Sequence, residues 1–157
     1  KLAQMGYCVV INYVSNDEEA QKTLELVEQA GSEGELLKFD VSNCTESVAA
    51  IESWQEAHPG EFIEVLVNNA GISYVGLLQD MKPEEWNDVI STNLSSAFYT
   101  SKLATPLMLE KKSGKIINIS SIWGLFLLQE SGFRFLSFKT CLETLISFFF
   151  CFSACYF

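Results

Sequence analysis

Four short stretches of this chain combine residue types that could bind or transform a ligand. They are Asp40-Val41, Asn69-Ala70-Gly71, the single Asn93, and Ser121. Small residues such as Ala70 and Gly71 let a ligand approach the backbone, and a side-chain amide or hydroxyl can donate and accept hydrogen bonds. Taken singly, each stretch also has an ordinary explanation as a loop, a helix residue or a turn. Their meaning therefore depends on the elements that position them.

Strand and helix patterns alternate along the chain from Gly6 onward. Short β-branched runs predict buried strands at 7–13, 35–40, 62–67 and 115–120. Capping residues and apolar spacing predict helices at 16–30, 45–57 and 83–108. Strands separated by helices of these lengths form βαβ units, so the predicted fold is α/β, a Rossmann-like doubly wound parallel sheet. Ligands of such sheets bind at the carboxyl ends of the strands, where three of the four stretches lie.

Composition excludes several classes of function. The 157 residues suit one domain, and the net charge of −10 with Arg134 as the sole arginine argues against a nucleic-acid partner. Five irregularly spaced cysteines indicate reduced thiols and a cytoplasmic location. The lone His58 and the cysteine spacing predict no metal site.

The four stretches, in this order and on these elements, resemble the short-chain dehydrogenase/reductase family. Within that family they are most similar to the branch of 3-oxoacyl-[acyl-carrier-protein] and acetoacetyl-CoA reductases. The resemblance implies that Asp40 and Val41 contact the adenine of the cofactor, and that Asn69, Ala70 and Gly71 line its ribose. It also implies that Asn93 holds a water of the proton relay and that Ser121 hydrogen-bonds the substrate carbonyl.

The resemblance further implies an activity and its partners. The expected reaction is NADPH-dependent reduction of a 3-oxoacyl thioester, carried by acyl carrier protein or by CoA, to the 3-hydroxyacyl product. The neutral residues that follow the first predicted strand, Asn12 to Ser15, favour NADP(H) over NAD, because an NAD site usually has an acidic residue there. Family members are commonly homotetramers with the Asn93 helix at an interface, an assembly that a missing C-terminal half would disrupt.

Two family features are absent from the sequence. The glycine-rich phosphate loop and the first strand would precede Lys1, and residues 1–6 resemble the end of a helix, so we expect the chain to begin inside a larger protein. The catalytic Tyr and Lys of the family would fall near positions occupied by Arg134 and Phe138, and no Tyr-x-x-x-Lys occurs anywhere. Guanidinium is a poor general acid, since its pKa is above about 12. We therefore expect an inactive fragment.

The composition changes abruptly near Leu125. Nine of the twelve phenylalanines lie after it, which divides the chain into a partial dinucleotide-binding domain, 1–125, and a divergent apolar tail, 126–157. A frame change or a fused unrelated sequence would explain this tail. The uncharged run 145–157 is short for a membrane span. Two alternatives to a reductase therefore stay open: a non-catalytic remnant of a nucleotide-binding fold, and a protein that associates with membranes through its tail.

Overall fold

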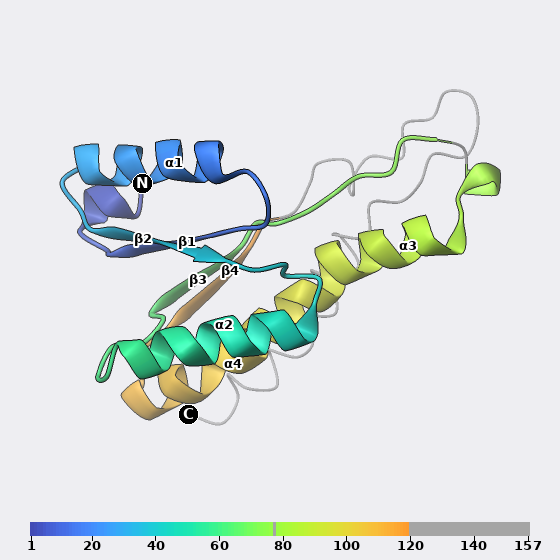
Figure 1. The fold of residues 1–157 in the computed structure, drawn as a ribbon. Coiled ribbons are helices and arrows are strands. Elements are labelled where there is room, and N and C mark those ends of the chain that lie inside the picture. The colour runs from blue at the N-terminus through green and yellow to red at the C-terminus, as the bar shows by residue number, and fades with distance from the viewer. Residues whose placement is uncertain (77, 120–157) are drawn as a thin grey trace.

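A computed structural model of the chain describes residues 1–76 and 78–119. Four strands run through this part: β1 Val9–Tyr13, β2 Gly34–Lys38, β3 Val65–Asn68 and β4 Lys115–Asn118. Helices cover both faces of the strands, with α1 on one side and α2 and α4 on the other (Figure 1). The predicted α/β class with parallel strands is confirmed, as a partial fold.

The strands pair in two separate parallel sheets. In the first, β1 pairs with β2 from Val9↔Gly34 to Tyr13↔Lys38, and in the second β3 pairs with β4 from Val65↔Lys115 to Asn68↔Asn118. Within residues 1–76 and 78–119, no ladder joins β1 to β3. The two strand pairs agree with the predicted doubly wound parallel sheet as an incomplete fold. Both pairs run in the same direction, and their carboxyl ends converge (Figure 1).

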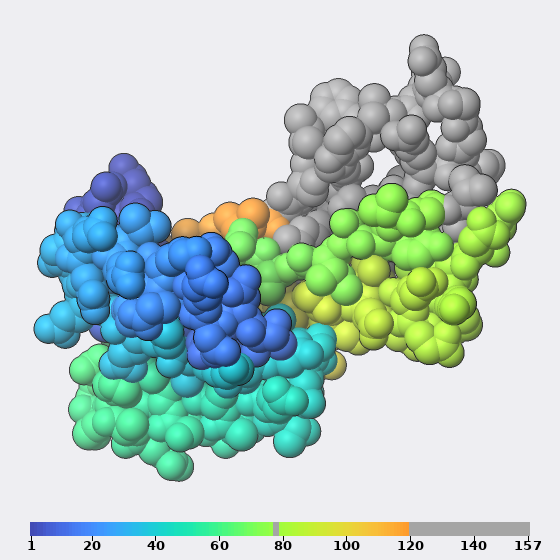
Figure 2. All heavy atoms as spheres, turned by 45° about the horizontal axis from the view of Figure 1, so that its top comes forward, coloured from blue at the N-terminus to red at the C-terminus, as the bar shows by residue number. Residues whose placement is uncertain are grey.

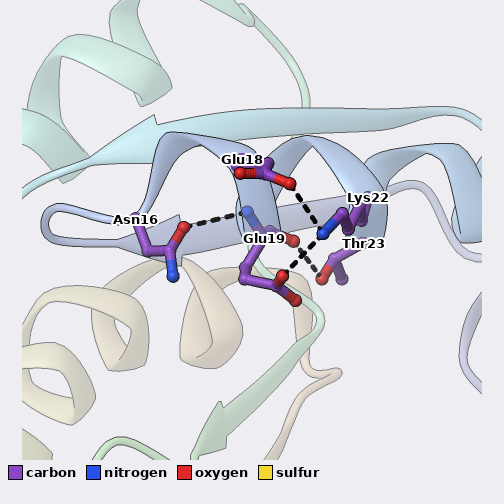
Figure 3. A network of polar contacts seen from close by, with 5 residues as sticks. All are labelled: Asn16, Glu18, Glu19, Lys22 and Thr23. Atoms are coloured by element: carbon purple, nitrogen blue, oxygen red, sulfur yellow. Dashed lines mark hydrogen bonds and ion pairs between the residues drawn. The ribbon is translucent and has the colours of Figure 1, made fainter.

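Helix α1, Asp17–Gln29, starts where its capping residue predicts. The Oδ1 of Asn16 accepts the N–H of Glu19 at 3.1 Å, which satisfies one of the free donors of the first turn. Lys22 pairs with Glu18 at 2.9 Å and with Glu19 at 2.8 Å on the exposed face (Figure 3). The helix contacts both β1 and β2, so it fixes the first strand pair.

Helix α2, Cys44–Ala57, lies on the opposite face and packs against α4, Ser96–Lys111. A small apolar core forms here around Phe39, Val41 and Ile51. Partly buried side chains of Leu37, Ala50, Ile63 and Leu103 pack against it. This core ties the end of β2 to both helices.

The long helical stretch predicted at 83–108 is confirmed, and it contains a π-helical turn that was not predicted. The segment consists of α3, Pro83–Ile90, a π-helical turn, Ser91–Ser95, and α4. Pro83 occupies the first turn of α3 as expected. A π-turn adds one residue to a helical turn without interrupting the chain, so hydrophobic periodicity does not reveal it. From the end of β3 the chain extends away from the strands to reach α3 (Figure 1; Figure 2).

Smaller elements also refine the predictions. The helix end expected at the N-terminus is a short 3-10 helix, Ala3–Met5, closed by Gly6 at φ 86°. A second 3-10 helix, Leu78–Asp80, precedes α3. Strand β3 begins at Val65, three residues after the predicted start.

No described helix has the length and apolar character needed to cross a bilayer, and no cluster of three metal-ligating side chains occurs in the same part of the chain. The predicted tail 126–157, with Arg134 and Phe138, lies outside the described residues.

Candidate functional site

A cavity of about 490 Å³ extends between the two strand pairs to their carboxyl ends. Val41, Asn69, Ala70 and Asn93 line it, so the structure brings these four predicted site residues together. Of the other predicted residues, Asp40 and Gly71 are outside the lining, and Ser121 lies outside the described part of the chain. The carboxyl ends of strands are where a parallel α/β fold binds its ligands.

The Asp40 carboxylate organises the turn that leaves β2. The Oδ1 of Asp40 accepts the N–H of Ser42 at 2.8 Å, and the backbone N–H of Asp40 donates to the Glu46 carboxylate at 3.1 Å. Asn43 then caps α2 by accepting the N–H groups of Thr45 at 3.0 Å and Glu46 at 3.2 Å. The turn is thus held by side-chain to backbone hydrogen bonds, an arrangement common for Asp and Asn in turns.

Val41 follows Asp40 in this turn. It is only 8% exposed and packs with Phe39 and Ile51, while part of its surface reaches the cavity. A flat apolar ring system at this corner of the cavity would therefore meet an anchored apolar side chain.

Asn93 fixes the loop that follows β3. Its Oδ1 accepts the N–H of Ile72 at 2.8 Å, and its Nδ2 donates to the Ile72 carbonyl at 2.8 Å. The π-helical turn places Asn93 opposite this loop, and π-turns occur frequently at functional sites. Asn93 therefore shapes the Asn69-Ala70-Gly71 segment directly ahead of Ile72.

Sequence reasoning missed Asn68 as a structural centre of the site. Its Oδ1 accepts the hydroxyl of Thr100 at 2.7 Å, and its Nδ2 donates to Asn118 at 2.9 Å and to Ser101 at 3.3 Å. These bonds join β3, β4 and α4 at the floor of the cavity. The strands β3 and β4 each end in asparagine, and the two residues pair in register, which the sequence alone does not reveal.

Sequence reasoning also missed Lys38, which meets the end of β1. Its Nζ lies 2.8 Å from the Asp17 carboxylate and 5.4 Å from the centre of the Tyr13 ring. The hydrogen bond from Lys38 lowers the pKa of Asp17, and the same bond raises the pKa of Lys38. A hydrogen bond to Asp17 raises the pKa of Tyr13. The Lys38 ammonium group therefore lies beside the carboxyl end of β1, where residues 12–15 carry no charge.

A protein-family model described as short chain dehydrogenase matches residues 1–132, a range that includes every residue lining the cavity. The chain is 40% identical over 124 residues to the 3-oxoacyl-[acyl-carrier-protein] reductase FabG of Staphylococcus aureus, covering 79% of this chain and 50% of that protein. It is 38% identical over 124 residues to the 3-oxoacyl-[acyl-carrier-protein] reductase of a Synechocystis species, covering 79% and 49%. The chain therefore spans about half the length of these curated relatives.

Solved structures show the same fold. A metagenomic short-chain oxidoreductase in complex with NADP has a TM-score of 0.79 and 29% identity, with 93% of this chain and 65% of that chain covered. A gluconate 5-dehydrogenase from Burkholderia cenocepacia, in complex with NADP and tartrate, has a TM-score of 0.79 and 26% identity, with 97% and 58% covered. Both similarities extend over nearly all of this chain.

Proposed function

This chain belongs to the short-chain dehydrogenase family, and we propose that it carries part of an NADPH site for reducing 3-oxoacyl thioesters. The observation that carries the proposal is the grouping of Val41, Asn69, Ala70 and Asn93 around one cavity at the carboxyl ends of the strands. When bound, NADPH supplies the hydride for such a reduction. The similarity to two 3-oxoacyl-[acyl-carrier-protein] reductases supports a thioester on acyl carrier protein or CoA as the substrate.

In this proposal the adenosine half of the cofactor lies against β2 and β3. Val41 presents an anchored apolar surface to the adenine, while the Asp40 turn is already ordered by its own hydrogen bonds. The exposed Asn69, Ala70 and Gly71 lie where the ribose would pass, and the small residues allow close approach to the backbone.

Lys38 supports a preference for NADP(H). Its ammonium group stands at the carboxyl end of β1, where a 2′-phosphate would add negative charge. In this structure Lys38 forms an ion pair with Asp17. A bound phosphate would therefore either share Lys38 with Asp17 or replace Asp17 as its partner. The two NADP complexes among the similar structures agree with this preference.

We assign Asn93 a positioning role, because both polar atoms of its side chain already bond to Ile72. The proposed task of Ser121 is to donate a hydrogen bond to the 3-oxo oxygen of the substrate. The chain supplies no Tyr-x-x-x-Lys to protonate the resulting alkoxide. The proposed behaviour of these 157 residues is therefore nucleotide binding without turnover, as in a non-catalytic remnant. The homotetramer and the cytoplasmic location implied by the family remain parts of the proposal.

A paired assay tests the proposal. NADPH fluorescence is titrated with the chain, and oxidation of NADPH by acetoacetyl-CoA is followed at the same concentrations. We expect a saturable signal and no oxidation above the protein-free blank. The Lys38→Ala variant should weaken binding of NADPH more than binding of NADH, whereas Lys22→Ala, at an exposed position of α1 outside the cavity lining, should leave both unchanged. A catalytic rate above the blank would contradict the lack of turnover, and the absence of any saturable signal would overturn the nucleotide site.

A further inference from the structure

The turn between β2 and α2 leaves one backbone donor free. Asp40 donates its N–H to the Glu46 carboxylate at 3.1 Å. Ser42 and Asn43 donate theirs to the carboxylate and the carbonyl of Asp40, at 2.8 Å and 3.0 Å. The N–H of Val41 has no acceptor among the described residues, although Val41 is only 8% exposed and lines the cavity. A buried donor normally has a partner, so this N–H is available to a ligand in the cavity.

An acceptor lies next to this donor in the chain. The Oδ1 of Asp40 accepts the N–H of Ser42, while its Oδ2 has no partner in the part of the chain that the structure describes. A donor and an acceptor on adjacent residues match the amino edge of adenine, where the exocyclic amino group donates and the neighbouring ring nitrogen accepts. Hypoxanthine has the opposite pattern, because an oxygen replaces the amino group and the ring nitrogen carries a proton. The two groups can therefore distinguish these purine bases, provided that their separation is fixed.

Glu46 holds both sides of this turn with one carboxylate. Its Oε2 accepts the N–H of Asp40 at 3.1 Å, and its Oε1 accepts a hydrogen bond from the Nδ2 of Asn43 at 2.8 Å. The backbone of Glu46 lies in the first turn of α2 and donates its N–H to Asn43 at 3.2 Å. The Glu46 side chain thus connects the residue that ends the β2 segment to the residue that caps α2.

The helix that carries Glu46 is itself anchored. The next residue, Ser47, is fully buried, and its Oγ lies 3.5 Å from the Val41 carbonyl. One turn further along, Ile51 packs in the apolar cluster with Phe39 and Val41. Loss of the Glu46 carboxylate would therefore release the Asp40 side of the turn, while Val41 would keep its contacts with α2.

We propose that Glu46 is a positioning residue that fixes the Asp40 carboxylate relative to the Val41 N–H, and so sets the preference of the site for adenine over hypoxanthine. This inference rests on the proposed nucleotide site, to which it adds the origin of base selectivity. Glu46 is outside the cavity lining, and both of its carboxylate oxygens already have partners. Its effect on a bound nucleotide is therefore exerted through Asp40.

The test compares NADPH with its deamino analogue, in which hypoxanthine replaces adenine, by fluorescence titration of the full chain. We expect the wild-type chain to bind NADPH about ten-fold more tightly, since the analogue loses two hydrogen bonds of ordinary strength. In Glu46→Ala this ratio should fall to about three-fold or less, because the acceptor is no longer held in place. Glu46→Gln should keep most of the preference, since its amide oxygen can still accept the Asp40 N–H.

A matched control removes the same charge from the same helix. Glu52→Ala, at an exposed position of α2 outside the cavity lining, should leave the ratio at its wild-type value. Amide exchange without nucleotide examines the turn itself. The Asp40 amide should exchange about ten-fold faster in Glu46→Ala, because its acceptor is removed, and should stay near the wild-type rate in Glu46→Gln.

Failure of the positioning role and failure of the nucleotide site give different results. If the wild-type chain binds neither dinucleotide, the nucleotide site and the role of Glu46 are both overturned. If the wild-type chain binds NADPH but does not distinguish it from the analogue, or if Glu46→Ala retains the wild-type ratio, the nucleotide site stands and the positioning role fails. An equal loss of affinity for both dinucleotides in Glu46→Ala would assign Glu46 to the stability of the fold alone.

Discussion

Asn93 holds the backbone of Ile72 through both polar atoms of its side chain, at 2.8 Å each. Replacing it with alanine removes two hydrogen bonds of ordinary strength, each worth about 1 kcal/mol net. We expect Asn93→Ala to lower the free energy of unfolding by about 1–2 kcal/mol in urea titrations. Asn87→Ala on the exposed surface of α3 is the matched control and should change it by less than about 0.5 kcal/mol. Equal effects of the two changes would show that the Ile72 contact is not formed in solution.

His58 links the end of α2 to β2. Its Nδ1 lies 2.8 Å from the Trp54 carbonyl and its Nε2 lies 2.9 Å from Glu35, so both ring nitrogens face acceptors and the protonated ring satisfies both. The bond to Trp54 raises the pKa of His58, and the Glu35 and Glu61 carboxylates raise it further, against an opposing effect of burial. Its ring also stacks on Trp54 at 4.6 Å.

The pH dependence of stability follows from this raised pKa. Below the unfolded pKa of about 6.5 the contribution of His58 is fully present, and it is lost as the pH rises through the higher folded pKa. We expect the free energy of unfolding to fall between pH 6 and 8 in the wild-type chain, and the fall to become smaller in His58→Gln. An unchanged pH profile in the variant would assign the effect to other groups.

At the scale of elements, the Asn43 cap joins the Asp40 turn to α2. Its Oδ1 accepts two N–H groups of the first turn, and its Nδ2 donates to Glu46 at 2.8 Å. Loss of such a cap costs about 1 kcal/mol, so Asn43→Ala should lower the free energy of unfolding by about that amount. Ser53→Ala, at an exposed position within the same helix, should raise it slightly, because alanine is the better helix former. Chemical denaturation of both variants provides the comparison, and a stabilising effect of Asn43→Ala would contradict the cap.

Elements that depend on local chemistry were predictable from the sequence, and those that depend on contacts across the fold were not. Asn16 and Pro83 mark the helix starts that the structure shows, because capping and first-turn preferences act within a few residues. The π-turn around Asn93 was missed, since its extra residue leaves the apolar pattern almost unchanged. Lys38 and Asn68 were missed because their partners lie at least 21 residues away in the chain.

At the scale of the whole molecule, no backbone ladder joins the two parallel strand pairs within the described residues. Helix α1 contacts β1 and β2, whereas α4 contacts β3. The main connection between the strand pairs is the apolar cluster of Phe39, Val41 and Ile51, which also contacts Ile63 near β3 and Leu103 of α4. The predicted class of fold was correct because alternating strands and helices determine it. The two separate strand pairs agree with the prediction of an incomplete sheet that lacks its first strand.

This connection predicts how the molecule unfolds. Ile51 is 5% exposed within the cluster, and Ile51→Val should destabilise the chain by about 1 kcal/mol. If the cluster joins the two sheets, amide exchange should accelerate by a similar factor in β1–β2 and in β3–β4, since both then open in one cooperative event. Leu26→Ala, at a side chain that is 64% exposed on α1, should accelerate neither. Acceleration confined to β1–β2 would show instead that the two strand pairs unfold independently, each stabilised mainly by its own helix.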